Sequence, residues 1–397
     1  MPFNIVSDNR MGSSGSRPIS EKNIVIVGGS YAGRAVASLL DAGFTVTWIE
    51  RRPFLIHKMM VRSAVREDWI DAAFVPNDKI LKRGKLVQGN VVSVDQEKKT
   101  LEYEGTDGSK HAIPFDYLVL ATGATSVCPV EPTFSTLEES NADSIKRFFK
   151  ETCATIGKHK DILVIGGGPV GCELAGEIKA AHPEARVTLA NQTDTLCGSL
   201  KASQVNSDKL KAALEKCGVT VQLGQTIRNV PREGITEYTD PMDFSDSIKG
   251  ITLVLKSTGN KPNTSFLPAE LLNERHQIKV NEFLQVSDSV FAIGDCNDVA
   301  EPKLFTTAGT KKFMFGFPIG QADVAARNIL AVDEKKPLAP YVPSSKKQAA
   351  LIPIGDKHAV AFNAPAFFAK MKANDFFFPA QWKFANLKAP KVPKITK

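Results

Sequence analysis

The sequence predicts an α/β fold made of two similar strand–turn–helix units, followed by a small C-terminal α+β region. Two observations carry this prediction. The glycine-rich turn Gly166–Gly171 has the spacing G-x-G-x-x-G, follows the apolar run Ile162–Ile165 and precedes a helical segment. A related turn, Gly28–Gly33, lies upstream in the same setting, after Ile24–Val27. Because a strand, such a turn and a helix form a phosphate-binding unit, we expect two Rossmann-like dinucleotide-binding domains.

The composition is that of a globular chain with two or three domains. Its 397 residues are 43% hydrophobic and 23% charged. The sequence contains no run of about 18 apolar residues, so we expect no membrane-spanning helix. The net charge is +7, and residues 331–397 hold twelve Lys and only four acidic residues. The six cysteines form no C-x-x-C pair, which argues against a disulfide framework, a zinc site and a thiol redox centre, and no metal is expected.

The first 21 residues are expected to form a flexible leader. Gly12–Ser16 is a run of glycine and serine, and the apolar stretch of a secretory signal is missing. Met11–Ser16 also fits the myristoylation pattern M-G-x-x-x-S, which requires that Gly12 becomes exposed. The alternative is an unmodified leader.

The first unit has the residues of a nucleotide site, with one departure. The middle position of its turn is Ser30, whose hydroxyl either helps to bind phosphate or loosens the approach of the backbone. The helix is expected over Arg34–Leu40 and the second strand over Phe44–Ile49, directly before Glu50. An acid about 20 residues after the first glycine accepts a hydrogen bond from a ribose 2′-OH and excludes a 2′-phosphate by charge repulsion. The adenosine of FAD or NAD therefore fits this unit.

The chain between the second strand and the end of the first unit is mixed. A basic cluster follows Glu50 and consists of Arg51, Arg52, His57, Lys58 and Arg62. Some of these residues either neutralise a pyrophosphate or flank a flavin ring, or the cluster forms a solvated loop. Residues 89–94 and 99–103 alternate in polarity and predict an antiparallel meander. The apolar strand Phe115–Gly123, which ends in Ala-Thr-Gly, closes the unit.

The second unit is expected to start with a helix over Thr136–Ile156 and to have the helix of its turn over Glu173–Ala181. Its second strand, Arg186–Ala190, is followed by Asn191 and not by an acid. With no carboxylate to repel a 2′-phosphate and no arginine fork to bind one, both NADH and NADPH are expected to be used. Strands are expected over residues 219–223 and 251–254, and the second is followed by Ser-Thr-Gly at 257–259.

The chain then returns to the first unit. The apolar strand Val290–Asp295 ends in Gly-Asp, and a helix is expected within Lys303–Leu330, with the small Ala308 near its start. The N-terminal dipole of such a helix stabilises negative charge on a group that lies at its N-terminus.

These motifs together resemble the two-dinucleotide-fold, FAD-dependent pyridine nucleotide oxidoreductases. Within them the chain is most similar to the family of the ferroptosis suppressor proteins and apoptosis-inducing-factor-like proteins, related to the type II NADH dehydrogenases. The likeness runs from Asn23 to Leu330 and is carried by Gly28–Gly33 with Glu50, Ala121–Gly123, Gly166–Gly171 with Glu173, Ser257–Gly259, Gly294–Asp295 and the stretches His182–Leu189 and Val290–Val299.

The resemblance implies bound FAD, NADH or NADPH as hydride donor, and a membrane quinone such as ubiquinone or vitamin K as acceptor, whose quinol limits lipid peroxidation. It implies FAD-binding segments at 22–132 and 259–335, an inserted NAD(P)H domain at 133–258, and a C-terminal region at 336–397. Glu173 is expected to position the nicotinamide, and Lys303 to lie near the flavin and the quinone entrance. The expected cofactor-binding residues are Gly28, Gly29, Ser30, Tyr31, Ala32, Gly33, Glu50, Arg51, Arg62, Ala121, Thr122, Gly123, Gly166, Gly168, Val170, Gly171, Asn191, Thr258, Gly259, Gly294, Asp295, Thr306 and Ala308.

The tail interleaves aromatic residues with lysines between Phe362 and Lys397. Such a segment suits a membrane interface, where aromatic rings lie at headgroup level and lysines attract anionic lipid. We therefore expect a cytoplasmic protein that associates peripherally with a lipid droplet, the plasma membrane or the outer mitochondrial surface. Packing of the tail as the core of a C-terminal cap, or as the seam of a homodimer, is the alternative.

Two other functions compete with the quinone reductase. A soluble FAD-dependent reductase of an iron–sulfur protein or of monodehydroascorbate would use the same two units. An apoptosis-inducing-factor-like flavoprotein would use the basic tail to bind nucleic acid. Dense aromatic residues among the lysines favour lipid over duplex DNA.

Overall fold

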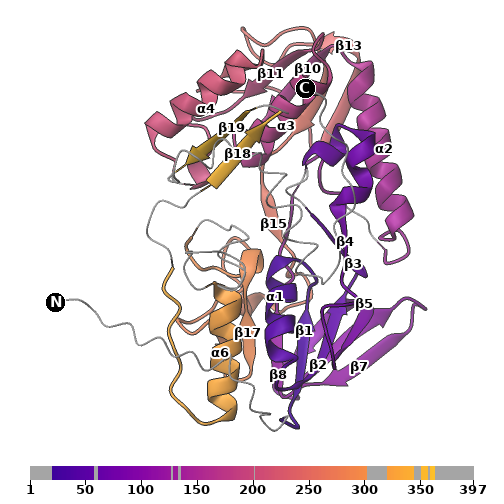
Figure 1. The fold of residues 1–397 in the computed structure, drawn as a ribbon, viewed down its shortest axis with the longest axis vertical. Coiled ribbons are helices and arrows are strands. Elements are labelled where there is room, and N and C mark those ends of the chain that lie inside the picture. The colour runs from indigo at the N-terminus through magenta and orange to yellow at the C-terminus, as the bar shows by residue number, and fades with distance from the viewer. Residues whose placement is uncertain are drawn as a thin grey trace, which may run out of the picture.

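The structure is a computed structural model, and it describes residues 20–57, 61–126, 128–132, 136–200, 202–301, 320–343, 350–355 and 358–362. Two sheets lie one above the other along the long axis of the molecule, each flanked by helices, with strand β15 running between them (Figure 1). This is the expected α/β architecture of two units.

The lower sheet in Figure 1 belongs to the first unit and has the strand order β16-β17-β8-β1-β2-β5-β6-β7. The five strands from β17 to β5 are parallel, and the meander predicted over residues 89–103 is confirmed as antiparallel β5, β6 and β7. The strands are β1 (Asn23–Val27), β2 (Thr45–Glu50), β5 (Lys85–Asp95), β6 (Thr100–Gly105), β7 (Lys110–Pro114), β8 (Tyr117–Leu120), β16 (Gln285–Ser287) and β17 (Val290–Ala292).

Helices α1 (Tyr31–Leu40) and α6 (Gln321–Asp333) pack against each other beside this sheet. Ile24 and Ile26 of β1 share a buried cluster with both helices, whereas Val25 and Val27 face a second cluster. A parallel strand that is covered on both faces has no polar face, which explains the unbroken apolar run of β1.

The second unit has a five-stranded sheet in the order β12-β11-β10-β14-β13, in which only β13 is antiparallel. Its strands are β10 (Asp161–Ile165), β11 (Arg186–Ala190), β12 (Thr220–Gln222), β13 (Ile235–Met242) and β14 (Ile251–Lys256). Its helices are α2 (Ala142–Lys158), α3 (Pro169–Ala181) and α4 (Gln204–Lys216).

Helix starts differ from the expected ones. Helix α2 begins six residues later than expected, because the Asn141 side chain accepts a hydrogen bond from the Ser144 N–H and caps the helix there. Helix α3 begins four residues earlier than expected, at Pro169, because proline at the first helical position loses no hydrogen bond. Glu173 consequently lies in the second turn of α3 and not at its start.

Three two-stranded sheets complete the described fold. Antiparallel β9 (Ala124–Ser126) and β15 (Asn260–Pro262) connect the two units. The hairpin of β18 (Ala350–Ile354) and β19 (His358–Phe362) packs on α3 and α4. The third sheet is β3 (Phe54–Ile56) with β4 (Phe74–Pro76), and the short 3₁₀ helices are η1 (Val61–Ala64), η2 (Glu67–Ala73), η3 (Gly198–Leu200), η4 (Ala269–Leu271) and η5 (Gly294–Cys296).

The packing crosses the expected domain boundaries. Val61 and Trp69, which lie within the first unit in sequence, share one buried cluster with Ile162 of β10 and Leu174 of α3. The segment from β3 to β4 therefore rests on the second unit, so the two units are joined by a continuous core as well as by β9 and β15.

Candidate functional site

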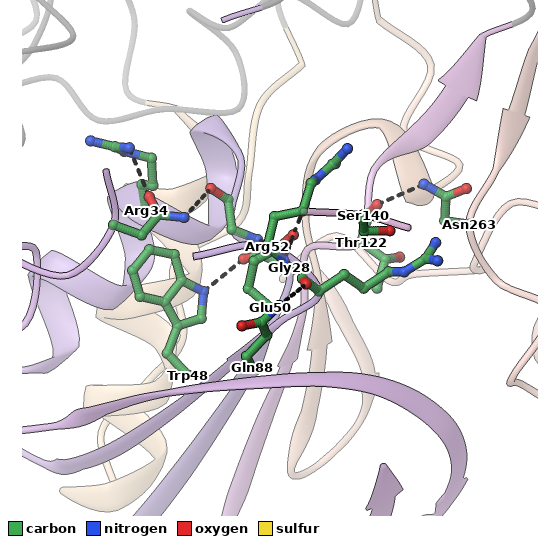
Figure 2. Close-up of polar contacts among 12 residues, drawn as sticks. Gly28, Arg34, Trp48, Glu50, Arg52, Gln88, Thr122, Ser140 and Asn263 are labelled. Carbon is green, nitrogen blue, oxygen red and sulfur yellow. Dashed lines mark hydrogen bonds and ion pairs between the residues drawn. The ribbon is translucent and has the colours of Figure 1, made fainter. Parts of the chain in front are cut away.

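The first phosphate turn links β1 to α1. Gly28 has a φ of +106°, and its N–H donates to the carbonyl oxygen of Ile49 at 2.9 Å. A Cβ at Gly33 would overlap the carbonyl oxygen of Gly28, so α1 can approach the turn only with glycine at this position. The indole N–H of buried Trp48 donates to the same carbonyl at 2.8 Å (Figure 2). The turn is thus held by the backbone and by β2.

Gly29 is held at both of its backbone polar groups. Its N–H donates to Oε2 of Glu50, and its carbonyl accepts from the side-chain amide of Asn77 at 3.2 Å. Glu50 also accepts from the Arg52 N–H at 3.1 Å, and Figure 2 shows Glu50 beside Arg52 at the end of the strand. The acid expected to bind a ribose therefore lies directly against the phosphate turn. Arg51 and Arg52 follow it, and burial lowers the pKa of Arg51.

Three buried polar residues lie behind this turn, and of these only His57 belongs to the basic cluster that the sequence marks after Glu50. Arg34, in the first turns of α1, donates to Oδ1 of Asn77 at 2.7 Å, and burial lowers its pKa to about 10. His57 hydrogen-bonds the hydroxyl of Tyr31, and burial together with the nearby charge of Arg34 lowers its pKa to about 3. Because Asn77 lies 48 residues from Gly29 in the sequence, no local spacing marks it.

The second turn repeats the backbone contacts of the first. Gly166 has a φ of +114°, its N–H donates to the carbonyl oxygen of Ala190 at 2.9 Å, and a Cβ at Gly171 would overlap its carbonyl oxygen. Asn191 is the residue equivalent to Glu50. Ile49 pairs with the last residue of β1 and precedes Glu50, and Ala190 pairs with the last residue of β10 and precedes Asn191. Its Oδ1 accepts from the Gly167 N–H at 2.9 Å.

The amide of Asn191 is otherwise used within its own loop. Its Nδ2 donates to the carbonyl oxygens of Thr193 and Thr195 at 3.0 and 3.1 Å. The carbonyl of Gly167 accepts from the Cys197 N–H at 2.7 Å, which is the role that Asn77 has at the first turn. Unlike Glu50, Asn191 therefore places no carboxylate beside its turn.

The strands that end in Thr-Gly lie next to the turns. The Ala121 N–H donates to Val27 and the Ser257 N–H to Ile165, each at 2.8 Å, so both Thr-Gly segments continue at the carboxyl ends of the central strands. The Thr122 and Ser257 hydroxyls are buried and make no hydrogen bond within the described part of the chain. Buried hydroxyls without partners suit groups that a bound nucleotide brings.

The expected Gly-Asp turn lies in η5 at the end of β17. Gly294 has a φ of +80°, and its N–H donates to Oε1 of Gln321, the first residue of α6, at 2.8 Å. Asn297 donates to the same oxygen at 2.8 Å. Asp295 is partly exposed beside this buried network.

Glu173 lies on α3, and the residue is partly exposed although its carboxyl group is buried. Within the described residues it makes no hydrogen bond or ion pair. Burial, with Cys197 and the negative Glu177 nearby, raises the pKa of Glu173 well above its usual value. Glu177, one turn further along α3, differs completely: it is buried and ion-paired with Arg62 at 2.6 Å. A carboxylate with a raised pKa and no partner is typical of a functional position.

Arg62 has other partners than those expected. Its guanidinium is 3% exposed, donates to Glu177 and to the carbonyl oxygen of Gly355, and stacks over the Trp69 ring at 4.7 Å. These contacts join η1, α3 and the C-terminal hairpin. The structure gives Arg62 a role in packing, and its role in binding FAD stays a prediction without support.

The remaining expected residues divide into two groups. Ser30, Ala32, Gly168 and Val170 lie at the starts of α1 and α3, and Thr258 and Gly259 at the end of β14. Lys303, Thr306 and Ala308, like the aromatic tail after Phe362, lie outside the described residues. A Cβ built at Gly168 meets nothing within 4 Å, so the space beside this turn is open to a ligand.

These residues fit FAD at the first turn. The turn offers helix N–H groups to a pyrophosphate, Glu50 suits a ribose hydroxyl, and the buried Thr122 hydroxyl lacks a partner among the described residues. In the same part of the chain, no group of three or more His, Cys, Asp and Glu side chains is arranged to hold a metal ion. None of the described helices combines the length and the apolar character needed to cross a membrane.

Comparison with known proteins agrees with this geometry. The chain is 33% identical over 312 residues to apoptosis-inducing factor homolog B of Dictyostelium discoideum, which covers 73% of this chain and 78% of that protein. It is 28% identical over 389 residues to human ferroptosis suppressor protein 1, with 94% and 98% covered. The sulfide:quinone oxidoreductase of Aquifex aeolicus shares the fold, with a TM-score of 0.67 at 16% identity over 93% of each chain.

The family model of the pyridine nucleotide-disulphide oxidoreductases matches residues 22–311, which include both phosphate turns and the Gly-Asp turn. The resemblance inferred from the motifs is thereby confirmed. The chain belongs to the pyridine nucleotide-disulphide oxidoreductase family.

Proposed function

We propose that the chain is a FAD-dependent NAD(P)H:quinone oxidoreductase. The observation that carries the proposal is the presence of two phosphate turns with the same backbone geometry and different ribose-facing residues, Glu50 and Asn191. One turn suits a resident FAD, whose adenosine ribose an acid would hold. The other suits an exchangeable nucleotide with or without a 2′-phosphate.

Bound FAD would supply the redox chemistry, which is hydride transfer from the nucleotide and two-electron transfer to the acceptor. Over one turnover NAD(P)H and a proton are consumed with the quinone, and NAD(P)⁺ and quinol leave. The chain itself binds and orients. Glu50 and the start of α1 would hold the adenosine diphosphate part of FAD, and Gly294–Asp295 its ribitol.

Glu173 would act on the second substrate. Its position on the helix that follows the second turn suits contact with a nicotinamide, and burial raises the pKa of its carboxyl well above the usual value. Lys303 would lie near the flavin and the quinone, as the family resemblance implies.

The quinone, the antioxidant role of its quinol and the membrane location come from the resemblance to the ferroptosis suppressor proteins. The lysine-rich tail supports the membrane location by its charge, since residues 331–397 hold eight more Lys than acidic residues. A homodimer through the C-terminal region is the competing use of the tail.

The test is a comparison of acceptors. FAD-loaded protein is given NADH or NADPH with a short-chain ubiquinone, a ferredoxin-type iron–sulfur protein or monodehydroascorbate, and nucleotide oxidation is followed. We expect turnover with the quinone to exceed the other two. Faster turnover with either of the others would move the assignment to a soluble reductase.

The tail is tested separately by flotation with vesicles that contain anionic lipid and by a duplex DNA mobility shift. Flotation without a DNA shift is expected. A DNA shift without flotation would support the nucleic-acid-binding alternative.

A further inference from the structure

The two units are connected by the antiparallel strands β9 and β15, and a glycine precedes each strand. Gly123 precedes β9 and has a φ of +68°, and Gly259 precedes β15 and has a φ of +78°. A Cβ built at either glycine meets nothing within 4 Å, so packing does not hold these two positions. Glycines in this conformation, without contacts, are positions where a chain can change direction at low cost.

Among the residues that the structure describes, β9 and β15 pair only with each other. The register pairs Asn260 with Ser126, Lys261 with Thr125 and Pro262 with Ala124. An isolated two-stranded ribbon is marginally stable and twists easily. The ribbon therefore does not fix its own direction where it leaves the first unit, and contacts beside it must supplement the buried core that Val61 and Trp69 share with the second unit.

Asn263, the residue after β15, supplies this connection. Its Nδ2 donates to the carbonyl oxygen of Thr122 at 3.0 Å, as Figure 2 shows, and its N–H donates to the carbonyl oxygen of Gly123 at 3.0 Å. Its Oδ1 accepts from the hydroxyl of Thr125 at 2.8 Å. One side chain from the strand that leaves the second unit thus holds the Thr-Gly turn beside the first nucleotide site.

We propose that Asn263 is a positioning residue that sets the angle between the two nucleotide-binding units, and thereby the placement of the nicotinamide against the flavin. The inference rests on the proposed function, because it assumes a hydride donor on the second unit and FAD on the first. A misplacement of about 1 Å is enough to slow a transfer about 100-fold, so a small change of this angle has a large effect. In this proposal Asn263 acts through its contacts with Thr122, Gly123 and Thr125.

The test substitution is Asn263→Asp. The carboxylate keeps the acceptor for Thr125, but it cannot donate to the carbonyl of Thr122 and repels it instead. We expect the rate of flavin reduction by saturating NADH, measured anaerobically by stopped flow, to fall about tenfold. The rate at which short-chain ubiquinone reoxidises the reduced flavin should change less than about twofold, since that step does not use the second unit.

An isotope effect separates positioning from simple destabilisation. With NADH deuterated at the transferred position, the isotope effect on flavin reduction should rise in the variant, because transfer becomes more strongly rate-limiting. FAD content and FAD affinity should stay at the wild-type level. Thr125→Val, which removes the donor to Oδ1 and little volume, should give the same pattern with a smaller change and serves if Asn263→Asp does not fold.

Asn281→Asp is the matched control, because it adds the same charge on a loop of the first unit and keeps the acceptor for the Phe283 and Gln285 N–H groups. It should leave both half-reactions unchanged. Equal losses in both half-reactions of Asn263→Asp, or loss of FAD with an unchanged isotope effect, would show that Asn263 only stabilises the fold. If wild-type protein binds FAD but neither nucleotide reduces it, the proposed function fails first and takes this inference with it.

Discussion

The first and second phosphate turns make the same backbone contacts but differ in side chains, and three of the differences bear on the ligands they would bind. Glu50 and Asn191 each accept from the N–H of the second residue of the turn. Ser30 stands where the second turn has Gly168, and both residues cap a helix with an extended backbone. The comparison teaches that the glycines and the sheet set the shape of the turn, whereas the residue after the second strand sets the charge beside it.

The third difference lies in the helices. Seven residues after the first glycine, α3 has Glu173, whereas α1 has the buried Ala35. In the proposed function, the resident cofactor and the exchangeable substrate thus face different helix surfaces. The first unit would only bind, and the second unit would also carry the residue that acts on its ligand.

The largest expected effects separate the two units completely. Gly33→Ala should give protein without FAD, because the new Cβ overlaps the carbonyl oxygen of Gly28, and overpacking of this kind costs about 1–3 kcal/mol. Gly171→Ala should keep the flavin spectrum but lose flavin reduction by NADH and NADPH. Spectra and anaerobic nucleotide titration measure both. Gly43→Ala is the control, since its Cβ meets nothing within 4 Å.

If Gly171→Ala lost FAD and Gly33→Ala did not, the assignment of the two turns would be reversed. Loss of FAD in both variants and in the control would show general misfolding instead, which circular dichroism detects.

The second prediction concerns Glu173→Gln. We expect the rate of flavin reduction by NADH to fall about 10- to 100-fold through poorer placement of the nicotinamide, while FAD binding is unchanged. Ala35→Ser, which puts a small polar group at the equivalent place on α1, should leave the reduction rate close to wild type. A Glu173→Gln variant that is reduced at the normal rate would remove the difference between the two helices.

The same substitution has an effect on stability that depends on pH. Because the folded protein raises the pKa of Glu173, the unfolded state releases this proton more readily than the folded state. This difference is a cost to the stability of the wild-type protein that increases as the pH rises above the ordinary glutamate value of about 4.3. At lower pH the carboxyl is protonated in both the folded and the unfolded state, and the cost vanishes. Thermal unfolding should therefore show Glu173→Gln to be more stable than wild type at pH 8 and equal to it near pH 4. A variant that is less stable at pH 8 would contradict this reasoning.

The third prediction concerns a substitution that makes the second turn more similar to the first. Asn191→Asp keeps the acceptor for the Gly167 N–H but puts a charge near a 2′-phosphate, so the KM for NADPH should rise about tenfold or more. The KM for NADH should stay within about threefold of wild type. Steady-state kinetics with both nucleotides measure this ratio. Equal changes for the two nucleotides would show that residue 191 does not face the ribose.

The smallest effect is expected from Ser30→Gly, which converts the first turn toward the second. The Ser30 side chain makes no capping hydrogen bond, and the equivalent Gly168 has open space where a side chain would lie. FAD affinity should therefore change by less than about threefold in either direction, as measured by flavin fluorescence. A loss of FAD would show instead that the Ser30 hydroxyl binds the pyrophosphate.

Both turns can be predicted from the sequence because the residues that shape them are adjacent in the chain and have few substitutes. Gly28 and Gly166 need a positive φ, and Gly33 and Gly171 need the absence of a Cβ. The unbroken apolar runs before them predict strands that are buried on both faces. The helix starts were less predictable, because a single residue decides each one. Asn141 caps α2, and Pro169 takes the first position of α3.

Long-range contacts explain what the sequence does not predict. Asn77 holds Gly29 from 48 residues away, and Arg62 pairs with Glu177 from 115 residues away. The sequence shows Arg62 only as a basic residue after Glu50, whereas the fold pairs it with Glu177 of the other unit. Asn263 lies 141 residues from Thr122, and only the three-dimensional arrangement reveals its contact with the first turn.

One anaerobic experiment tests the central claim most directly. Purified protein is reconstituted with FAD, its visible spectrum is recorded, and NADH and then a short-chain ubiquinone are added without oxygen. We expect a flavin spectrum that bleaches with the nucleotide and returns with the quinone. Protein that does not take up FAD would contradict the assignment of the first turn, and bound flavin that stays oxidised with NADH and NADPH would contradict that of the second.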